Sequence, residues 1–387
     1  MEVYLVGGAV RDELLGLAIK ERDWVVVGSS PEEMLAQGYK QVGKDFPVFL
    51  HPQSNEEYAL ARTERKHGRG YYGFEVHASP DVSLEEDLMR RDLTINAIAK
   101  SPSGELIDPY SGLQDINAKV LRHVSGAFIE DPLRVLRVAR FAAKLKTHGF
   151  TIADETLQLM RHIVSLGELI ELAPERIWQE TQRALETESP SEFFSVLHAV
   201  HALAQTHTGI SDRFANHQAR ATGLTALDEI SSQQQEPCVR FAALLGGLYF
   251  RQQENSYHDI QKLYEQLPLS NACKDLLRLT TTLQYKCYAA FTLNEKQLLS
   301  LLQKLDTRRK SERFVTLLSI FSTIKKAATN ETCDAQMNWL QLTAKTIDSV
   351  DVGKWVLQGL KNAELADHLE SAQLALIQRL IQDRNHS

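Results

Sequence analysis

The hydrophobic pattern of this sequence changes once, between residues 120 and 131, and that change limits the possible folds most strongly. Before it, short apolar runs rich in β-branched residues, at residues 3–6, 24–27 and 58–61, alternate with glycines, prolines and short helical stretches. Such a pattern is typical of a small mixed sheet. From Asp131 onward, Leu, Ala and Ile recur every three or four residues, which predicts amphipathic helices. The sequence therefore predicts an α+β chain, with an N-terminal head built on a small mixed sheet and an all-α remainder.

The composition excludes several broad classes of protein. Of 387 residues, 43% are hydrophobic and 24% are charged, which indicates a folded chain rather than a disordered or fibrous one. The formal net charge of -7 argues against binding of nucleic acid through overall positive charge, although a local basic face is compatible with it. We find no membrane-length apolar run and no basic leader with an apolar stretch, so we expect a cytoplasmic protein without membrane contact. Four widely spaced cysteines without a C-x-x-C pair predict reduced thiols: Cys238, Cys273, Cys287 and Cys333.

A short segment near the N-terminus carries the densest chemical signal. The apolar run at residues 3–6 leads into Gly7 and Gly8, a short helix follows, and a second apolar strand opens with the acid-x-acid pair Glu21 and Asp23. Glycines where a strand meets a helix allow backbone N–H groups to approach an anion such as a triphosphate. Two carboxylates that are two residues apart on a strand project from the same face, and such oxygen ligands suit Mg²⁺.

Each part of this segment has a simple structural alternative. A Gly-Gly pair is usually only a turn, and an acid-x-acid pair at the start of a strand is usually a solvated edge. The order strand, glycine pair, helix and acidic strand within 17 residues is much more specific than either part. We therefore interpret the segment as a unit that binds a nucleotide and a divalent cation.

Together with later motifs, this segment resembles the class II tRNA nucleotidyltransferases, which are the CCA-adding enzymes and their bacterial poly(A) polymerase relatives within the polymerase-β superfamily. The resemblance covers roughly residues 1–185. It implies a nucleotidyltransferase head that adds C, C and A from CTP and ATP to the 3′ end of tRNA without a nucleic-acid template, by in-line attack with two Mg²⁺ ions. The motifs are GGAVRD at 7–12, VGKDFPVFL at 42–50, EYALARTERK at 57–66, RRDLTINA at 90–97 and EDPLRVLR at 130–137.

The resemblance also assigns roles to single residues of the head. Gly8 and Arg11 of the glycine motif would lie beside the nucleotide. Arg91 would hold phosphate, while Asp92 or Asn96 would read the ribose 2′-hydroxyl. On physical grounds alone, residues 85–92 are an acid–base cluster on a helix surface.

A further motif would select the base. Asp131 followed by Pro132 is a strong helix start. Arg134, Arg137 and Arg140 follow at intervals of three residues, which predicts neighbouring guanidinium groups on the exposed side of that helix. From the residues alone, this segment is a helix cap and a solvated or phosphate-facing surface. The resemblance implies that Asp131 and Arg134 instead imitate a Watson–Crick edge for the incoming base, with Arg137 as a further contact.

The sequence departs from the family pattern at one metal-binding position. The family has Asp at both positions, and this chain has Glu at position 21. Because Mg²⁺ tolerates little error around its octahedron, the longer Glu21 predicts impaired rather than abolished chemistry. Glu57, on a later strand, is a possible third carboxylate that would deprotonate the attacking hydroxyl; a solvated edge acid is an equally good interpretation.

The resemblance ends near residue 185, within the helical part of the chain. We predict a nucleotidyltransferase head at 1–128, a helical neck with the nucleotide-selecting helix at 129–210, and a helical body and tail at 211–387. Many relatives carry an HD phosphohydrolase domain after the neck, whose His and Asp ligands hold a metal. Here glycines 246–247 stand where the His-Asp pair would be, and the dipeptide 258–259 lacks companion ligands, so we predict a degenerate HD-like region without metal ligands.

Other candidate groups are weaker. The spacing of three histidines is ligand-like, but we interpret them as core or surface residues: His198, His201 and His207. Residues 65–73 (RKHGRGYYG) resemble the family's mobile loop. Scattered basic side chains of the body would hold the acceptor and T arms of tRNA, namely Arg308, Arg309, Lys310, Lys325 and Lys326.

Two alternative functions remain open from the sequence. The same fold could perform partial CC- or A-addition, or poly(A) synthesis. Alternatively, Glu21 and the degenerate body could belong to a catalytically impaired paralogue that only binds RNA. The sequence gives no oligomeric state.

Overall fold

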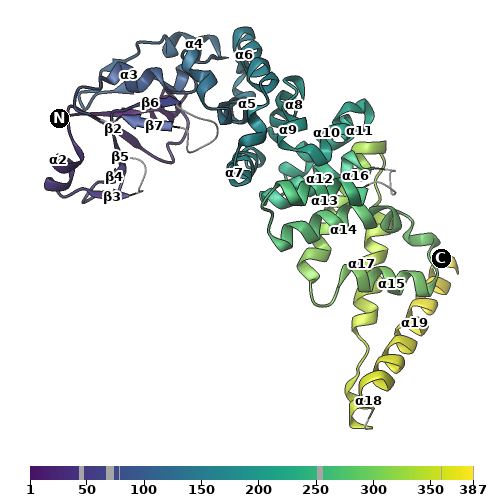
Figure 1. Ribbon diagram of the computed structural model, residues 1–387. Coiled ribbons are helices and arrows are strands. Elements are labelled where there is room, and N and C mark those ends of the chain that lie inside the picture. Colours follow the sequence, from purple (N-terminus) through teal and green to yellow (C-terminus); the bar gives the residue numbers. More distant parts are fainter. Residues whose placement is uncertain (43–47, 67–73, 78, 251–255, 359, 387) are drawn as a thin grey trace. The chain divides into compact units, whose positions relative to one another are not determined.

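The computed structural model describes residues 1–42, 48–66, 74–77, 79–250, 256–358 and 360–386 (Figure 1). The chain divides into two compact units, Met1–His207 and Thr208–Ser387. Over the described residues, the first unit contains every strand and the second contains only helices, which confirms the predicted α+β class. The predicted mobile loop lies largely outside the described residues, as does the centre of the VGKDFPVFL motif.

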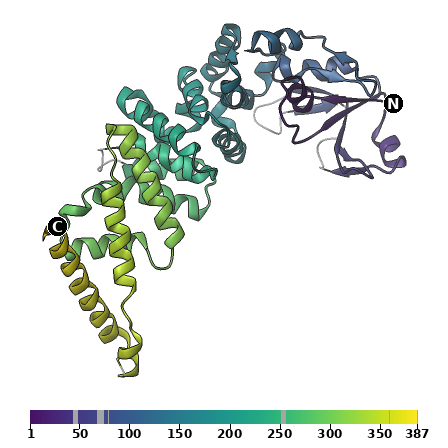
Figure 2. The ribbon, with the colours of Figure 1, turned by 180° about the vertical axis from the view of Figure 1, so that it is seen from behind.

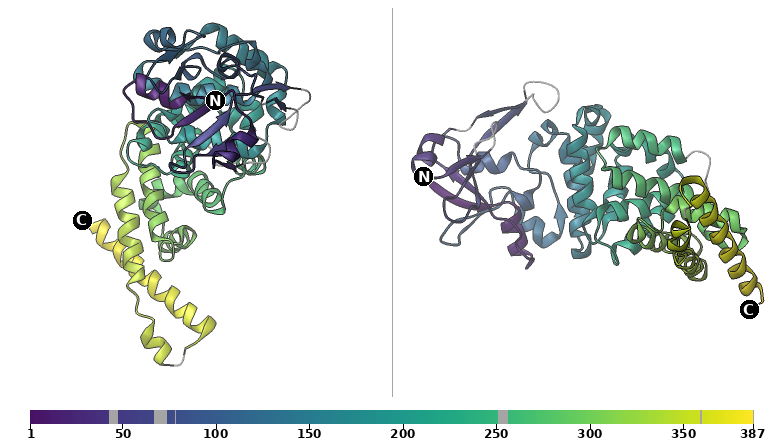
Figure 3. Two further views of the ribbon diagram at one scale, coloured as in Figure 1. Left: turned by 90° about the vertical axis from the view of Figure 1, so that its left-hand side faces the viewer. Right: turned by 90° about the horizontal axis from the view of Figure 1, so that it is seen from below.

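The head contains a mixed sheet (Figure 3). Its seven strands lie in the order β3-β4-β5-β2-β1-β8-β9. Neighbouring strands are antiparallel except β2 and β5, which run parallel. The strands of this sheet are β1 (Glu2–Val6), β2 (Asp23–Val27), β3 (Lys40–Val42), β4 (Val48–Leu50), β5 (Glu57–Leu60), β8 (Ala99–Lys100) and β9 (Leu106–Ile107). Two small sheets pair β6 (Thr63–Lys66) with β7 (Phe74–His77) and β10 (Val120–Leu121) with β11 (Thr151–Ile152).

Side-chain alternation along β2 supplies two apolar clusters on opposite faces of the sheet. Val25 packs with Leu88 of α3 on one face. Val26 packs with Met34 of α2 on the other face. Because Asp23 is two residues from Val25 on the same strand, its side chain belongs to the face that α3 covers. These helices are α2 (Pro31–Ala36) and α3 (Leu84–Met89).

The turn after β9 connects the sheet to the helices. Both carboxylate oxygens of Asp108 accept backbone hydrogen bonds, from Gly112 at 2.7 Å and from Leu113 at 2.8 Å, where α4 (Gly112–Ala118) begins. A Cβ on Gly112 would come within 2.3 Å of the Thr94 carbonyl oxygen, so no larger residue fits there without a shift. This D-P-x-x-G turn is therefore a structural junction.

Helix α5 (Leu133–Leu145) is the central helix of the first unit. It packs against α7 (Pro174–Leu185) and α8 (Pro190–Ala199), and all but three of its residues are buried. The prediction of an exposed arginine face on this helix is wrong, because Arg134 is buried and Arg137 and Arg140 keep only partial exposure. The other helices of this unit are α1 (Gly8–Leu14), α6 (Asp154–Ser165) and α9 (Leu203–Thr206).

In the second unit (Figure 2), α11 (His217–Ser231) packs closely on α12 (Pro237–Leu248), and α16 (Ser311–Thr329) lies against both. Glycines permit this approach, since a Cβ on Gly247 of α12 would lie 2.7 Å from the Cα of Gly223 in α11. The helices of this unit are α10 (Thr208–Ala215), α11 (His217–Ser231), α12 (Pro237–Leu248), α13 (Ser256–Gln266), α14 (Asn271–Tyr288), α15 (Glu295–Leu305), α16 (Ser311–Thr329), α17 (Asp334–Asp348), α18 (Gly353–Leu357) and α19 (Asn362–His386).

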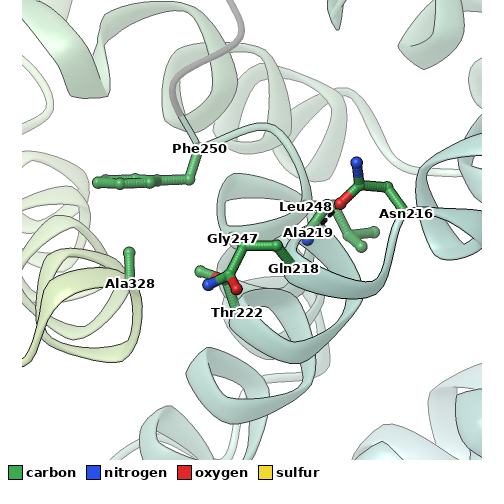
Figure 4. Close-up of a pocket in the computed structure, with 8 residues that line it drawn as sticks. All are labelled: Asn216, Gln218, Ala219, Thr222, Gly247, Leu248, Phe250 and Ala328. Atoms are coloured by element: carbon green, nitrogen blue, oxygen red, sulfur yellow. Dashed lines mark hydrogen bonds between the residues drawn. The ribbon is translucent and has the colours of Figure 1, made fainter.

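Gly247 therefore serves the close packing of α12 on α11. A hollow of ≈ 290 Å³ beside Gly247 is lined by small, amide and apolar residues, including Asn216, Thr222 and Phe250 (Figure 4). Asp259 accepts a hydrogen bond from Tyr249 at 3.1 Å, so it has a structural partner. Over the part of the chain that is described, no group of three or more His, Cys, Asp or Glu could hold a metal ion, and no helix is long and apolar enough to cross a membrane.

Candidate active site

The glycine turn is fixed by backbone conformation and by an arginine. Gly7 follows β1 with φ +70° and ψ −129°, a conformation that L side chains rarely adopt. A Cβ there would lie 2.8 Å from Nη1 of Arg91, so the guanidinium rests against the bare backbone of the turn. Gly8 begins α1 and has more room, because a Cβ there would lie 3.5 Å from the Arg11 side chain. Gly7 therefore lets Arg91 approach the end of β1.

We expect Gly7→Ala to lower the nucleotide transfer that the resemblance implies by about a hundredfold, because the added methyl group displaces the Arg91 guanidinium from the turn. Gly16→Ala is the matched control: Gly16 has φ +69° and nothing within 4 Å of its would-be Cβ. Both glycines have a positive φ, so both variants carry backbone strain; the strain is larger at Gly7, whose ψ of −129° lies outside the left-handed helical region, and only Gly7→Ala also meets Arg91. Steady-state kinetics and thermal unfolding of the two proteins check this, and equal activities would contradict the role of the close approach.

The two acidic residues are arranged differently from the sequence prediction. Strand β2 begins at Asp23, so Glu21 lies in the preceding loop rather than on the strand. The ladder ends there because Asp23 pairs with Val6, the last residue of β1 before the glycine turn. Glu57 is aligned with Asp23 on the parallel strand β5, and all three carboxylates are exposed. Glu57 forms no three-ligand cluster with the other two described acids.

The surroundings of Asp23 change the pKa of its carboxyl group. Although the residue remains accessible to solvent, partial desolvation raises the pKa of its carboxyl. Arg91 opposes that shift, and the nearby Glu21 carboxylate adds to it. Asp23 therefore lies between a positive and a negative neighbour at the end of β1, beside the glycine turn.

Arg91 is held by a carboxylate that sequence reasoning did not single out. Asp87 of α3 is fully buried and accepts hydrogen bonds from Arg90 Nη2 at 3.0 Å and from Arg91 Nη2 at 3.2 Å. Burial alone would raise the pKa of Asp87, but the two guanidinium groups outweigh it and hold that pKa below its usual range. The acid stands three and four residues before its partners, a helical spacing that could have identified it.

A buried polar chain connects the glycine motif to α5. Arg11 of α1 is 2% exposed and donates to the Oδ1 atom of Asn96. The amide of Asn96 donates to Oδ1 of Asp92 at 2.9 Å, and Arg137 of α5 donates to Oδ2 of Asp92 through Nε at 2.8 Å. Arg137 Nη2 lies 2.7 Å from the same oxygen. Burial would raise the pKa of Asp92, but Arg137 and Asn96 hold it well below the usual range.

These contacts constrain the predicted nucleotide contacts. Asp92 receives donors from Leu93, Asn96 and two nitrogens of Arg137, which together occupy the roughly four lone-pair positions of a carboxylate. A hydrogen bond from Asp92 to a ribose hydroxyl therefore requires one of these four to open. Arg11 is likewise occupied, because it also donates to Asp12 at 2.7 and 2.8 Å. Both side chains brace the site in this arrangement.

Helix α7 extends the polar chain through Glu180, which the sequence analysis missed. Glu180 is 3% exposed, accepts a hydrogen bond from Arg140 Nε at 2.5 Å, and lies 3.9 Å from Arg137 Nη1. The ring of Phe141 packs against the guanidinium groups of Arg11 at 5.0 Å and Arg140 at 4.4 Å. One acid and one aromatic ring thus allow several arginines to lie close together.

The predicted helix start at Asp131 is confirmed. Its Oδ1 atom accepts the backbone N–H of Leu133 at 3.0 Å, while Oδ2 lies 3.4 Å from Arg176 of α7. Arg134 donates to the carbonyl oxygens of Ala127 at 2.8 Å and Arg90 at 2.6 Å. Asp131 and Arg134 are therefore both engaged within the first unit.

Of the three candidate histidines, His207 is a core residue. It is fully buried, lies 3.1 Å from the Thr181 hydroxyl and 2.9 Å from the Thr206 hydroxyl, and packs edge-on against Phe194. Burial lowers its pKa to about 3.

This burial predicts a pH dependence of stability. Between about pH 6.5 and pH 3 the unfolded chain binds a proton at His207 that the folded chain does not, so stability falls as the pH falls. We expect the free energy of unfolding to drop by about 2 kcal/mol from pH 7 to pH 5 through this group. Denaturant unfolding of the wild type and His207→Gln at both pH values measures the difference. Equal pH slopes would contradict the assignment.

The turn, the adjacent acids and the arginine on one side of a mixed sheet indicate a nucleotidyltransferase, and the similarity to known proteins agrees. The protein-family model described as "Poly A polymerase head domain" matches residues 3–122 of this chain. A second family model, described as "Probable RNA and SrmB- binding site of polymerase A", matches residues 149–211. The CCA-adding enzyme of Marinobacter nauticus is 44% identical over 97% of this chain and 98% of its own length. That of Coxiella burnetii is 46% identical, over 98% and 96%.

The chain therefore belongs to the family of CCA-adding enzymes. A solved structure of a CCA-adding enzyme in an apo form matches with a TM-score of 0.71 at 19% identity, over 97% of this chain and 88% of the other. That similarity extends the agreement in fold to both units.

Proposed function

We propose that this chain adds C, C and A to the 3′ end of tRNA, using CTP and ATP and no nucleic-acid template. Membership of the family supports the reaction. The observation that carries the assignment to this site is the position of Asp23, at the first residue of β2, beside the Arg91 guanidinium that rests on Gly7. An acid and a cation at a bare glycine turn suit a metal-bound triphosphate.

The residues at the start of β2 fit Mg²⁺. Glu21 and Asp23 offer exposed hard oxygen ligands, and their mutual repulsion, which contributes to the raised pKa of Asp23, is relieved by a divalent cation. Glu21 and Asp23 would hold the ion, with phosphate oxygens and water completing its shell. When bound, Mg²⁺ would stabilise the charge that develops on the attacking and leaving oxygens.

Within that site the chain positions the reactants. The 3′-hydroxyl of the RNA attacks the α-phosphate of the nucleotide in line, and pyrophosphate leaves. Arg91, fixed by Asp87, binds the phosphates. We assign Arg11, Asp92 and Asn96 as positioning residues, because their polar groups are buried and already hydrogen-bonded to one another or to Arg137.

Asp131 and Arg134 select the base in this proposal, with Arg137 and Arg140 close by. One oxygen of Asp131 caps α5, which leaves the other to face a base once Arg176 moves from its 3.4 Å contact. Arg134 similarly exchanges its two carbonyl partners for a base edge. This selectivity is tested by offering each of the four nucleotides alone to a tRNA that lacks its 3′ end. Addition of UTP or GTP at rates similar to CTP would contradict it.

Partial CC- or A-addition and poly(A) synthesis differ from CCA addition in product length. With CTP and ATP together, the proposal requires that tRNA lacking CCA gain three nucleotides and stop. Products that end after two cytidines, or that gain only the terminal A, would support the partial activities, and a ladder of many adenosines would support poly(A) synthesis.

A substitution at Glu21 distinguishes an active enzyme from a catalytically impaired paralogue that only binds RNA. We expect Glu21→Asp to raise the rate of CTP addition by less than about a hundredfold, because the longer side chain still reaches a metal. Burst and steady-state kinetics of the two proteins measure this. A rise of a hundredfold or more from a rate near zero would instead support the impaired paralogue.

The tRNA contacts of the helical body remain part of the proposal. Among the candidate basic residues, Arg309 pairs with Asp306 at 3.0 Å and Lys310 lies 3.4 Å from Asp275. Both side chains stay largely exposed, at 84% and 53%, so these surface pairs are weak and can be exchanged for phosphates.

A further inference from the structure

Two cysteines from different helices border one pocket of the second unit. The pocket is open to solvent and has a volume of ≈ 650 Å³. Cys238, the second residue of α12, and Cys273, the third residue of α14, both line it. The two helices pack directly against each other. The first turns of two neighbouring helices therefore present their thiols to the same solvent-accessible space.

The two thiols are in hydrogen-bonding contact. The bond from the Cys273 thiol lowers the pKa of Cys238, while burial and the nearby Glu236 oppose the shift. The same bond and burial raise the pKa of Cys273. Cys238 is half-buried and Cys273 is buried. Cys238 is therefore the more accessible thiol of the pair, as expected for the sulfur that meets a peroxide, and Cys273 lies in contact with it, as a resolving thiol must.

Charged groups around the pocket balance one another. Its basic lining residues are Arg309, Lys310 and Arg313, and its acidic ones are Glu236, Asp275 and Glu312. The reactivity of Cys238 therefore depends on its hydrogen bond and on its place in the first turn of α12, where the helix dipole favours negative charge.

The other two cysteines provide internal controls. Cys287 and Cys333 are buried, and burial raises the pKa of each thiol. Neither borders the pocket that Cys238 and Cys273 share. A reagent that requires an accessible thiolate should therefore distinguish the two pairs within one folded protein.

We propose that Cys238 and Cys273 form a dithiol modification site that a peroxide converts to an intramolecular disulfide. The Cys238 thiolate attacks one peroxide oxygen, so that a sulfur–oxygen bond forms, the oxygen–oxygen bond breaks, and the leaving hydroxide takes up a proton as water. The Cys273 sulfur then attacks the sulfenic sulfur; the sulfur–sulfur bond forms, and hydroxide leaves with the Cys273 proton as a second water. Two thiols are oxidised by two electrons, and one peroxide is reduced to two waters.

Hydrogen peroxide tests the site on the full, folded chain. After graded exposure and alkylation of free thiols, peptide mapping without reduction should show a Cys238–Cys273 cross-link, smaller by two hydrogen atoms, before any change at Cys287 or Cys333. Restoration by dithiothreitol should follow. Oxidation at Cys287 or Cys333 first, or Cys238 that becomes sulfinic acid without a cross-link, would overturn the proposal.

Two variants assign the roles of the thiols. In Cys238→Ser, at a half-buried position, Cys273 should resist peroxide as Cys287 does. In Cys273→Ser, Cys238 should stop at sulfenic acid, which dimedone captures. If Cys273 is oxidised equally fast without Cys238, the assigned nucleophile is wrong. Circular dichroism of both variants confirms that the comparison is between folded proteins, and the order of labelling in the wild type tests the proposal even if one variant fails to fold.

Discussion

Asp23→Asn should lower nucleotide addition by at least about a thousandfold. The substitution removes one of the two carboxylates that we propose to hold Mg²⁺ beside the triphosphate. Asp23 is the first residue of β2 and its side chain remains accessible, so the amide should fit without repacking the sheet. Single-turnover incorporation of CTP into a shortened tRNA measures the loss.

A matched control separates charge at this position from charge in general. Glu85→Gln also removes one exposed carboxylate from the head, in the first turn of α3, and Glu85 is not among the groups that shift the pKa of Asp23. It should keep nearly full activity, and thermal unfolding should be nearly the same for both variants. Activity of Asp23→Asn within about tenfold of the wild type would remove Asp23 from the catalytic centre.

Asp92→Ala should have the largest effect on stability. It leaves Asn96 and Arg137 without their shared acceptor. We expect a loss of about 3 kcal/mol, at the lower end for a buried ion pair, because Arg137 keeps 33% side-chain exposure. Transfer activity should fall with it, since the arginines near the base lose their support. Denaturant unfolding and kinetics of the same preparation measure both effects.

A double variant tests whether the ion pair itself is responsible. Arg137→Met in the Asp92→Ala background removes the stranded charge and should recover part of the lost stability. Activity should not recover, because Arg137 is also proposed to lie near the base. Strictly additive losses in the two single variants and the double variant would show that the two side chains act independently.

Local backbone chemistry explains why part of the site was predictable. A glycine with φ +70° and an Asp-Pro helix start leave direct marks in the sequence, and both lie where the motifs predicted. The helical remainder followed from the spacing of apolar residues. In this segment the sequence prediction was wrong about the start of β2, because it placed Glu21 on the strand. The pairing of β2 with β1 begins only at Asp23, since β1 ends at Val6, before the turn at Gly7.

The roles of the arginines were less predictable, because they depend on distant partners. Arg137 meets Asp92, 45 residues away, and Arg140 meets Glu180, 40 residues away. Three-residue spacing placed the α5 arginines on a common side but could not indicate that Glu180 of α7 meets two of them. Arg134 donates hydrogen bonds to backbone carbonyl oxygens, and a pattern of side chains in the sequence does not reveal such partners.

The most direct test of the central claim is incorporation of labelled CTP and ATP into a tRNA that lacks its 3′ end, with and without Mg²⁺. The proposed function predicts two cytidines and then one adenosine in the presence of the metal, and none after chelation. Absence of incorporation with Mg²⁺ present, or equal incorporation after chelation, would contradict the proposal that Glu21 and Asp23 form a metal-dependent nucleotidyltransferase site.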